Sequence, residues 1–190
     1  MEDLIEIRWH GRGGQGVVTA GKLLAEMAMS SGRYFQAFPD YGPERMGAPI
    51  QAFTRLSTHP ISIHCQIQEP DIVVVLDSSL LGTVPVVKGL KDDGLLLVNT
   101  AMSPEQVRRL AGCIKGKVYT VDASLIAIAE TGLVITNTPM LGALARVAGL
   151  FELAKMEEEL RAWFGQKISI KAVESNIRAM RRAATAVQGG

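Results

Sequence analysis

The first feature that could do chemistry is a glycine-rich turn. It combines four glycines with one glutamine, namely Gly11, Gly13, Gly14, Gln15 and Gly16, and contains the pattern GxGxxG. Residues 5–10 alternate apolar and polar side chains like a strand, and apolar residues from Val17 onward recur at helical spacing. Glycine lets a backbone approach a phosphate, and the free amides at a helix N-terminus favour an anion. We expect an anion or nucleotide to contact this turn; the alternative is a tight turn that only permits close helix packing.

A dinucleotide site would need a further acidic residue. In such folds an Asp or Glu about 20 residues beyond the turn, at the tip of the second strand, holds the ribose hydroxyls. Here the expected second strand covers residues 34–38, and Asp40 follows only after Pro39. The missing acid at the strand tip argues against NAD, although a stand-alone NAD-binding oxidoreductase stays open as an alternative function.

A long loop follows this strand. Residues 41–49, from Tyr41 to Pro49, are too rich in Gly, Pro and charge to form core, and the segment is longer than a usual connection of about 4–6 residues. Arg45 could bind a phosphate or carboxylate through two hydrogen bonds, and Tyr41 could stack on a ring or pack against another chain. The alternative is that Glu44 and Arg45 are solvated loop charges.

Asn137 is a further candidate ligand. Thr138 and Pro139 after it have the residue types that begin a helix, which accounts for much of this motif in structural terms. Asn137 remains available at the C-terminal side of the preceding segment, where ligands of open sheets bind. The candidate binding residues are therefore those of the glycine turn, Arg45 and Asn137.

The sequence shows no catalytic or metal-binding constellation. His10, His59 and His64 lack metal-ligand spacing, and no Ser or Cys stands in a nucleophile motif. Cys65 and Cys113 are far apart and cannot supply the four thiolates of an iron–sulfur cluster. We therefore expect two free thiols, no catalytic residue and no metal site in this chain.

Strands and helices alternate around these candidates. Residues 72–76, 95–98 and 118–121 are mostly β-branched or aliphatic runs, and helix-start signals follow them at Asp77, Ser103 and Asp122. Such alternation favours parallel pairing. Two further runs, residues 50–56 and 61–67, predict an antiparallel hairpin inserted into this pattern.

The last third of the chain is helical in pattern. Helices are expected at residues 139–149, at 152–164 and from 170 or 171 to about 187, and the terminal Gly189 and Gly190 are expected to fray. No linker or repeat divides the chain. We predict an α/β protein, a Rossmann-like three-layer sandwich with a mixed, mostly parallel sheet and an inserted β-hairpin, as a single domain over residues 1–190.

Charge and apolar content indicate which classes of partner and which location to expect. Twenty basic and nineteen acidic residues give a formal charge of +1, so no global field favours nucleic acid or an anionic membrane. No apolar run approaches the roughly 20 residues that span a bilayer, and the first residues lack the pattern of a secretory signal. We expect a soluble, cytoplasmic protein.

Four motifs together resemble the gamma subunit of pyruvate:ferredoxin oxidoreductases, in the 2-oxoacid:ferredoxin oxidoreductase family. They cover residues 10–16, 37–49, 73–77 with Leu80 and Leu81, and 137–144, in this order along nearly the whole chain. Some relatives have Arg-Gly-Gly after the Gly-Pro-Glu stretch, where this chain has Arg45-Met46-Gly47-Ala48-Pro49. That departure favours the pyruvate branch over the 2-oxoglutarate and indolepyruvate branches.

The resemblance implies partners and a reaction that the residues alone do not show. In the family, alpha and beta subunits bind thiamine diphosphate, a delta subunit or ferredoxin-like domain carries iron–sulfur clusters, and the gamma domain packs against them and helps receive coenzyme A. The complex turns a 2-oxoacid, coenzyme A and oxidised ferredoxin into acyl-coenzyme A, carbon dioxide and reduced ferredoxin. By this resemblance the isolated chain would be inactive. Which 2-oxoacid is used, whether the Tyr41–Pro49 loop contacts coenzyme A or a partner, and a purely nucleotide-binding scaffold role stay open.

Overall fold

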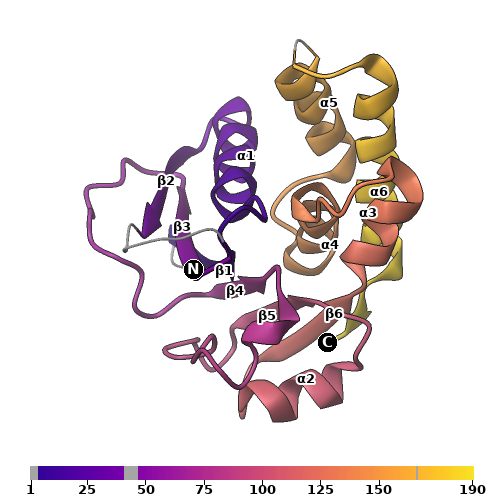
Figure 1. The fold of residues 1–190 in the computed structure, drawn as a ribbon. Helices are drawn as coiled ribbons and strands as arrows, with labels where there is room; N and C mark the ends of the chain where they lie inside the picture. The colour runs from indigo at the N-terminus through magenta and orange to yellow at the C-terminus, as the bar shows by residue number, and fades with distance from the viewer. Residues whose placement is uncertain (1–3, 41–46, 166) are drawn as a thin grey trace.

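The computed structural model describes residues 4–40, 47–165 and 167–190 (Figure 1). Its strands form one mixed sheet in the order β2-β3-β1-β4-β5-β6-β7. The four central strands are parallel: β1 (Leu4–Arg12), β4 (Ile72–Val75), β5 (Leu95–Asn99) and β6 (Lys117–Val121). The three outer strands pair antiparallel: β2 (Tyr34–Asp40), β3 (Pro49–Ser57) and β7 (Gln188–Gly189). The predicted mixed sheet is thus confirmed, with its parallel part in the centre.

Two of the central strands, β4 and β5, are largely apolar because both of their faces are covered. Every residue of β4 and β5 is buried. Val74 and Leu97 point into one hydrophobic cluster, whereas Val73 and Leu96 point into a second cluster on the opposite face. Strands buried on both sides are continuous aliphatic runs, which is why sequence alone identifies them.

Helices form layers on the two faces of the sheet. The larger layer holds α1 (Val17–Ser30), α3 (Ala123–Thr131), α4 (Asn137–Ala148), α5 (Leu153–Phe164) and α6 (Ile170–Ala186). The other face is covered by the short 3₁₀ helix η1 (Ser78–Leu80), by α2 (Pro104–Ala111) and by the segment between η1 and β5. Figure 1 shows α2 on the side of the sheet away from α4 and α5. The predicted three-layer α/β sandwich is confirmed.

Helix starts in this layered structure follow the predicted caps. Ser103 caps α2, and its hydroxyl accepts from the backbone N–H of Gln106, whose side chain accepts from the Ser103 N–H. The Asp122 carboxylate accepts from the Leu125 N–H at the start of α3. Each bond satisfies amides that a helix leaves free at its N-terminus.

The inserted hairpin exists, but the prediction of its second strand was wrong. β3 confirms the predicted strand over residues 50–56, yet its hairpin partner is β2, and residues 61–67 form no strand. The reason is that β3 has β1 on one side and β2 on the other, so neither of its edges remains free. Residues 61–67 instead run along the sheet, where the carbonyls of Ile61 and Ile63 accept from the side chains of Gln36 and Arg55.

The end of the chain also differs from expectation. Gln188 and Gly189 do not fray but pair with Thr120 and Tyr119 of β6 as the short strand β7. A terminal segment becomes ordered when it closes an exposed sheet edge, and a pair of glycines gives no sequence signal for that. Among the described residues, no helix combines the length and apolar character that crossing a membrane requires.

Candidate functional site

The glycine turn joins β1 directly to α1. Gly16 precedes the helix in the left-handed conformation, with φ 78° and ψ 24°. Within the described part of the chain no side chain caps this helix, and its first internal bond runs from the Ala20 N–H to the Gly16 carbonyl. The amides of residues 17–19 therefore have no helical acceptor, and α1 carries no acidic residue in its first turn. These are the features of a helix N-terminus that can accept an anion.

Asn137 lies against this turn. It begins α4, it is buried, and its carboxamide oxygen accepts from the Thr138 N–H at 2.8 Å. Its amide nitrogen is 3.2 Å from the point where a Cβ on Gly16 would lie. Two candidates that are far apart in sequence are thus neighbours in space, whereas Arg45 falls outside the described residues.

Gln15 is held within the chain by both ends of its side chain. Its Oε1 accepts from the Arg12 N–H at 2.8 Å, and its Nε2 donates to Asp77 Oδ2 at 2.7 Å. The side-chain amide therefore fixes the shape of the turn from within. The Gln15 backbone N–H also donates to the Arg12 carbonyl at 3.1 Å, so Gln15 contacts an anion only if one of these bonds breaks.

Arg12 and Asp77 are site residues that the sequence motifs did not single out as ligands. The Arg12 guanidinium, 33% exposed, lies 3.2 Å from Asp77 Oδ2 and donates to the Ser79 hydroxyl at 2.9 Å and to the Gly47 carbonyl at 3.0 Å. Asp77 was recognisable only as a helix cap, and its Oδ1 does accept from the Ser79 N–H. A usable signal was its place just beyond the C-terminal end of a buried parallel strand, where ligand sites form.

The charge on Asp77 is stabilised where it lies. Partial burial acts to raise its pKa, but the hydrogen bonds from Ser79 and Gln15 and the positive charge of Arg12 outweigh burial, so the net effect is a lowered pKa. Asp77 is therefore ionised at neutral pH and can hold both partners.

The start of β3 is also tied to the turn. The Gly13 N–H donates to the Ala48 carbonyl at 2.9 Å, and the Gly47 N–H donates to the Gly13 carbonyl at 3.2 Å. The described end of the loop that began at Tyr41 thus lies beside the glycine turn, and Pro49 already belongs to β3.

A polar cavity of about 330 Å³ opens beside Gln15 at the carboxyl ends of the parallel strands. Its lining combines Asp77, Asn99, Asp122 and Ser124. Asn99 is fixed there, because its amide nitrogen donates to the Leu76 carbonyl and to the Ser124 hydroxyl, at 2.9 Å each. This polar crevice occupies the position where open α/β sheets bind ligands.

The site does not have the arrangement of a dinucleotide fold. β3 lies between β1 and β2, so the second strand of the chain is not beside the first. Asp40, at the end of β2, accepts a hydrogen bond from Gln66 at 2.7 Å. The strands that pair with β1 are β3 and β4, and the acid that follows β4, Asp77, is already bound to Gln15, Ser79 and Arg12.

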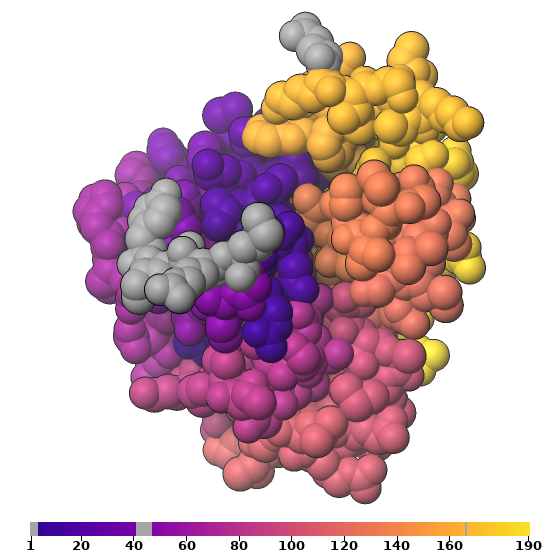
Figure 2. Space-filling view, in the orientation of Figure 1, coloured from indigo at the N-terminus to yellow at the C-terminus, as the bar shows by residue number. Residues whose placement is uncertain are grey.

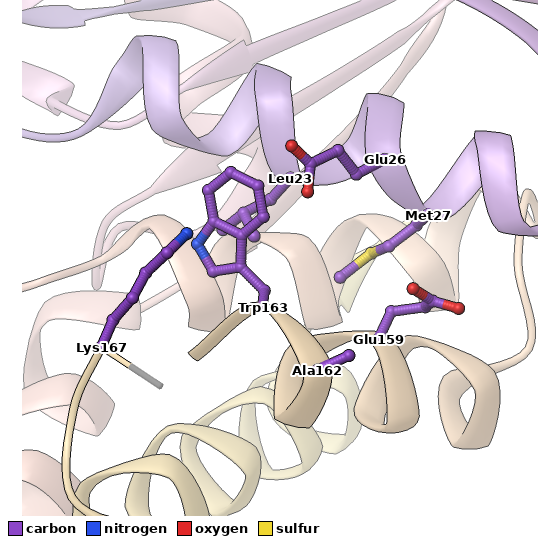
Figure 3. Close-up of a pocket in the computed structure, with 7 residues that line it drawn as sticks. All are labelled: Leu23, Glu26, Met27, Glu159, Ala162, Trp163 and Lys167. Carbon is purple, nitrogen blue, oxygen red and sulfur yellow. The ribbon is translucent and has the colours of Figure 1, made fainter. Parts of the chain in front are cut away.

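A second cavity lies between α1 and α5 (Figure 3). The carboxylates of Glu26 and Glu159 flank it, and the Lys167 ammonium lies 3.6 Å from the centre of the Trp163 ring. Burial, followed by the charge of Glu159, raises the pKa of Glu26. This cavity borders the C-terminal half of α1 rather than the glycine turn, so we take the polar crevice beside Gln15 as the candidate site.

The remaining predicted features have structural roles or lie elsewhere. His10 is buried and accepts a hydrogen bond from Arg8 Nε at 3.1 Å, while burial, aided by the Arg8 charge, lowers its pKa to about 3. Cys65 is exposed and Cys113 is buried, and both are free thiols as expected. Among the described residues, no three His, Cys, Asp or Glu side chains gather as a metal site would require.

Comparison with known proteins gives consistent matches. The family model described as pyruvate ferredoxin/flavodoxin oxidoreductase matches residues 6–186. "Pyruvate synthase subunit PorC" of Thermotoga maritima is 48% identical over 177 residues, 93% of this chain and 91% of the relative. The "Pyruvate/ketoisovalerate oxidoreductases common subunit gamma" of Pyrococcus furiosus is 49% identical over 180 residues, 95% of each chain.

Solved structures agree with these matches. The crystal structure of pyruvate oxidoreductase subunit PORC from Thermotoga maritima superposes with a TM-score of 0.88 at 43% identity, over 100% of this chain and 99% of the other. A gamma subunit of a keto/oxoacid ferredoxin oxidoreductase from Geobacter sulfurreducens has a TM-score of 0.75 at 22% identity, over 96% of this chain and 95% of the other. At that identity the second match supports the fold alone.

Proposed function

The chain belongs to the pyruvate ferredoxin/flavodoxin oxidoreductase family, and we propose that, as the gamma subunit of such an enzyme, it helps to bind coenzyme A and packs against the subunits that carry the chemistry. The whole enzyme would oxidatively decarboxylate a 2-oxoacid to acyl-coenzyme A and pass the electrons to ferredoxin. We further propose that residues 1–190 form one domain, which the two hydrophobic clusters on opposite faces of a single sheet support.

The observation that carries the coenzyme A proposal is the uncapped start of α1 behind the glycine turn. Coenzyme A brings a pyrophosphate, and free helix amides approached through glycine suit such an anion. It needs no acid to hold ribose hydroxyls at the tip of β2, where Asp40 is bonded to Gln66 instead. Asn137, against Gly16, would supply a neutral hydrogen-bonding group at the edge of the same site. We retain Arg45 as a further phosphate ligand in this proposal.

The proposed division of labour assigns the remaining cofactors to partners. Thiamine diphosphate would belong to alpha and beta subunits, and iron–sulfur clusters to a delta subunit. Two cysteines cannot ligate such a cluster, which supports this assignment. Relatives described as a subunit common to pyruvate and ketoisovalerate oxidoreductases support a gamma chain that leaves the choice of 2-oxoacid to other subunits.

An exposed apolar surface supports the packing role. Five large aliphatic side chains within residues 125–135 are about half exposed or more: Leu125, Ile128, Leu133, Val134 and Ile135. The last of them is two residues before Asn137. Figure 2 shows the surface of this part of the chain, salmon to orange, beside the indigo surface of the N-terminal residues. A stretch of sequence that exposes several large apolar side chains is typical of contacts between proteins.

Replacing Asn137 with Ala in the assembled enzyme tests the site. Loss of one hydrogen-bonding group from the coenzyme A site should raise KM for coenzyme A about twofold to tenfold, because such a bond contributes about 0.5–1.5 kcal/mol. The value of kcat should change little if the group binds substrate and transition state equally. KM for the 2-oxoacid should not change.

The matched control is Asn176→Ala. Asn176 lies on α6, where its side chain donates to the Ala172 carbonyl at 2.9 Å, away from the turn. Equal KM values for coenzyme A in both variants and the unmodified enzyme would remove Asn137 from the site. Coenzyme A-dependent turnover of a complex that lacks this chain, with an unchanged KM, would refute the proposed function as a whole.

A further inference from the structure

We propose that Asp77 is a positioning residue of this site, which holds the glycine turn in its binding shape through Gln15 and Arg12. The inference rests on the proposed function, because it assigns a role within the same coenzyme A site. Asp77 follows β4, whereas the turn follows β1, the neighbouring strand. One carboxylate therefore connects the loops of two adjacent strands.

The contacts of Asp77 divide between its two oxygens. Oδ2 accepts from Gln15 Nε2 at 2.7 Å and lies 3.2 Å from Arg12 Nε. Oδ1 accepts from the Ser79 N–H at 2.9 Å and so caps η1. One oxygen thus contacts the turn, and the other maintains local structure after β4. The two roles can be separated by mutation.

The bonds beyond Asp77 extend its hold over the turn. Gln15 Oε1 accepts from the Arg12 backbone N–H, which fixes Arg12 to Gln15 across the turn. The Arg12 guanidinium donates to the Gly47 carbonyl and thereby fixes the segment that leads into β3. Gly13 pairs with the same segment through backbone bonds. Displacing the Asp77 carboxylate would therefore loosen both the glycine turn and the segment that leads into β3.

The carboxylate has the charge that this role requires. Within the described part of the chain, the Asp77 carboxylate forms an ion pair with Arg12. The other carboxylate that lines the same cavity belongs to Asp122. Hydrogen bonds to an ionised acceptor are about twice as strong as neutral ones, so Asp77 can keep a glycine-rich segment ordered. Such order matters because glycine loses more conformational freedom than any other residue when it is fixed.

Asp77→Asn is the sharpest perturbation. An Asn side chain can keep its carbonyl oxygen toward the Ser79 N–H, so the cap of η1 is preserved. Its amide group then faces Gln15 Nε2 and the Arg12 guanidinium, all of which are donors. The substitution removes the contacts to the turn without removing volume, and we expect KM for coenzyme A to rise about tenfold at a nearly unchanged kcat.

Asp71→Asn is the matched control at the other end of the same strand. Asp71 precedes β4, accepts from the Glu6 N–H at 2.8 Å and pairs with Lys91 at 2.7 Å. The chemical change and the partial exposure are similar, but the glycine turn follows the opposite end of β1. We expect Asp71→Asn to leave KM for coenzyme A unchanged.

The double variant Asp77→Asn with Gln15→Glu tests the mechanism. The new carboxylate at position 15 can accept from the Arg12 N–H with one oxygen and from the new amide at position 77 with the other, so the bond is restored with donor and acceptor exchanged. We expect KM to return to within about threefold of the unmodified enzyme, since the lost hydrogen bond is regained. A single variant that raises KM without such recovery would overturn the role of Gln15 in the mechanism.

Hydrogen exchange of the assembled enzyme gives a readout that does not depend on coenzyme A. Peptides that cover residues 11–19 should exchange faster in Asp77→Asn than in Asp71→Asn. Equal exchange and equal KM in the two variants would overturn the proposal for Asp77. If Asp77→Asn loosens the turn but neither it nor Asn137→Ala alters KM, Asp77 positions the turn as inferred and the coenzyme A role is what fails.

Discussion

Gly16→Ala probes the junction between the turn and Asn137, and its cost can be separated into two parts. The first is conformational, because Gly16 has φ 78° and a left-handed backbone costs a residue with a Cβ about 1–2 kcal/mol. The second is steric, because the new Cβ would lie 3.2 Å from the Asn137 amide nitrogen, which must move by a few tenths of an ångström. Crowding a packed site costs about 1–3 kcal/mol. The expected total loss in the free energy of unfolding is about 2–5 kcal/mol.

Gly32→Ala isolates the conformational part at the other end of the same helix. Gly32 has φ 73°, and no described atom lies within 4 Å of the point that its new Cβ would occupy. Chemical denaturation of the two variant chains should show a loss of about 1–2 kcal/mol for Gly32→Ala and a larger loss for Gly16→Ala. Only Gly16→Ala should also raise KM for coenzyme A. Equal losses of stability in both variants would refute the packing of Asn137 against the turn.

Two further predictions concern the surface and the core. Val134→Asp places a charge at a position that is 67% exposed in the apolar stretch, and it should weaken subunit assembly at least about tenfold. The control Ile114→Asp changes a side chain that is 91% exposed after α2, and it should not weaken assembly. Native mass spectrometry of the co-expressed complex distinguishes the two variants. The pKa of His10 is lowered from 6.5 to about 3 in the folded state, so on acidification the unfolded chain binds a proton at this residue first. The contribution of neutral His10 to the free energy of unfolding is therefore fully present above pH 6.5 and is lost as the pH falls toward 3. The loss is on the order of 5 kcal/mol, and His10→Gln should flatten the dependence of the unfolding free energy on pH. An unchanged pH dependence in that variant would exclude His10 as its source.

The elements that sequence predicted well are those whose residues serve one local purpose. β4 and β5 are aliphatic because both faces are buried, and a short, unbroken aliphatic run is typical of such strands. Ser103 and Asp122 mark helix starts because a side-chain oxygen three residues before a free amide caps it wherever the helix lies. These signals do not depend on which strand pairs with which.

Pairing is where local reasoning failed. Residues 61–67 alternate as convincingly as residues 34–40, and a short connection to β3 made them the natural hairpin partner. The choice was decided by β1, which occupies one edge of β3 and leaves a single edge for two competing segments. β2 pairs with that edge, and residues 61–67 are held instead by the side chains of Arg55 and Gln36, which donate to their carbonyls. Competition for an edge is a property of the whole sheet.

Contacts between residues that are far apart in the sequence also limited the prediction of the site. The glycine turn could be predicted because backbone geometry requires its glycines. The contacts of Asp77 with the turn could not be predicted, because Gln15 lies 62 positions away in the sequence. What makes them neighbours is the parallel pairing of β1 with β4, which brings the ends of both strands to one edge of the sheet. A polar residue at or just beyond the C-terminal end of each parallel strand is therefore a better indicator of a site than any motif in a single loop. Asp77, Asn99 and Asp122 satisfy that condition in three successive strands, and all three line the crevice beside Gln15.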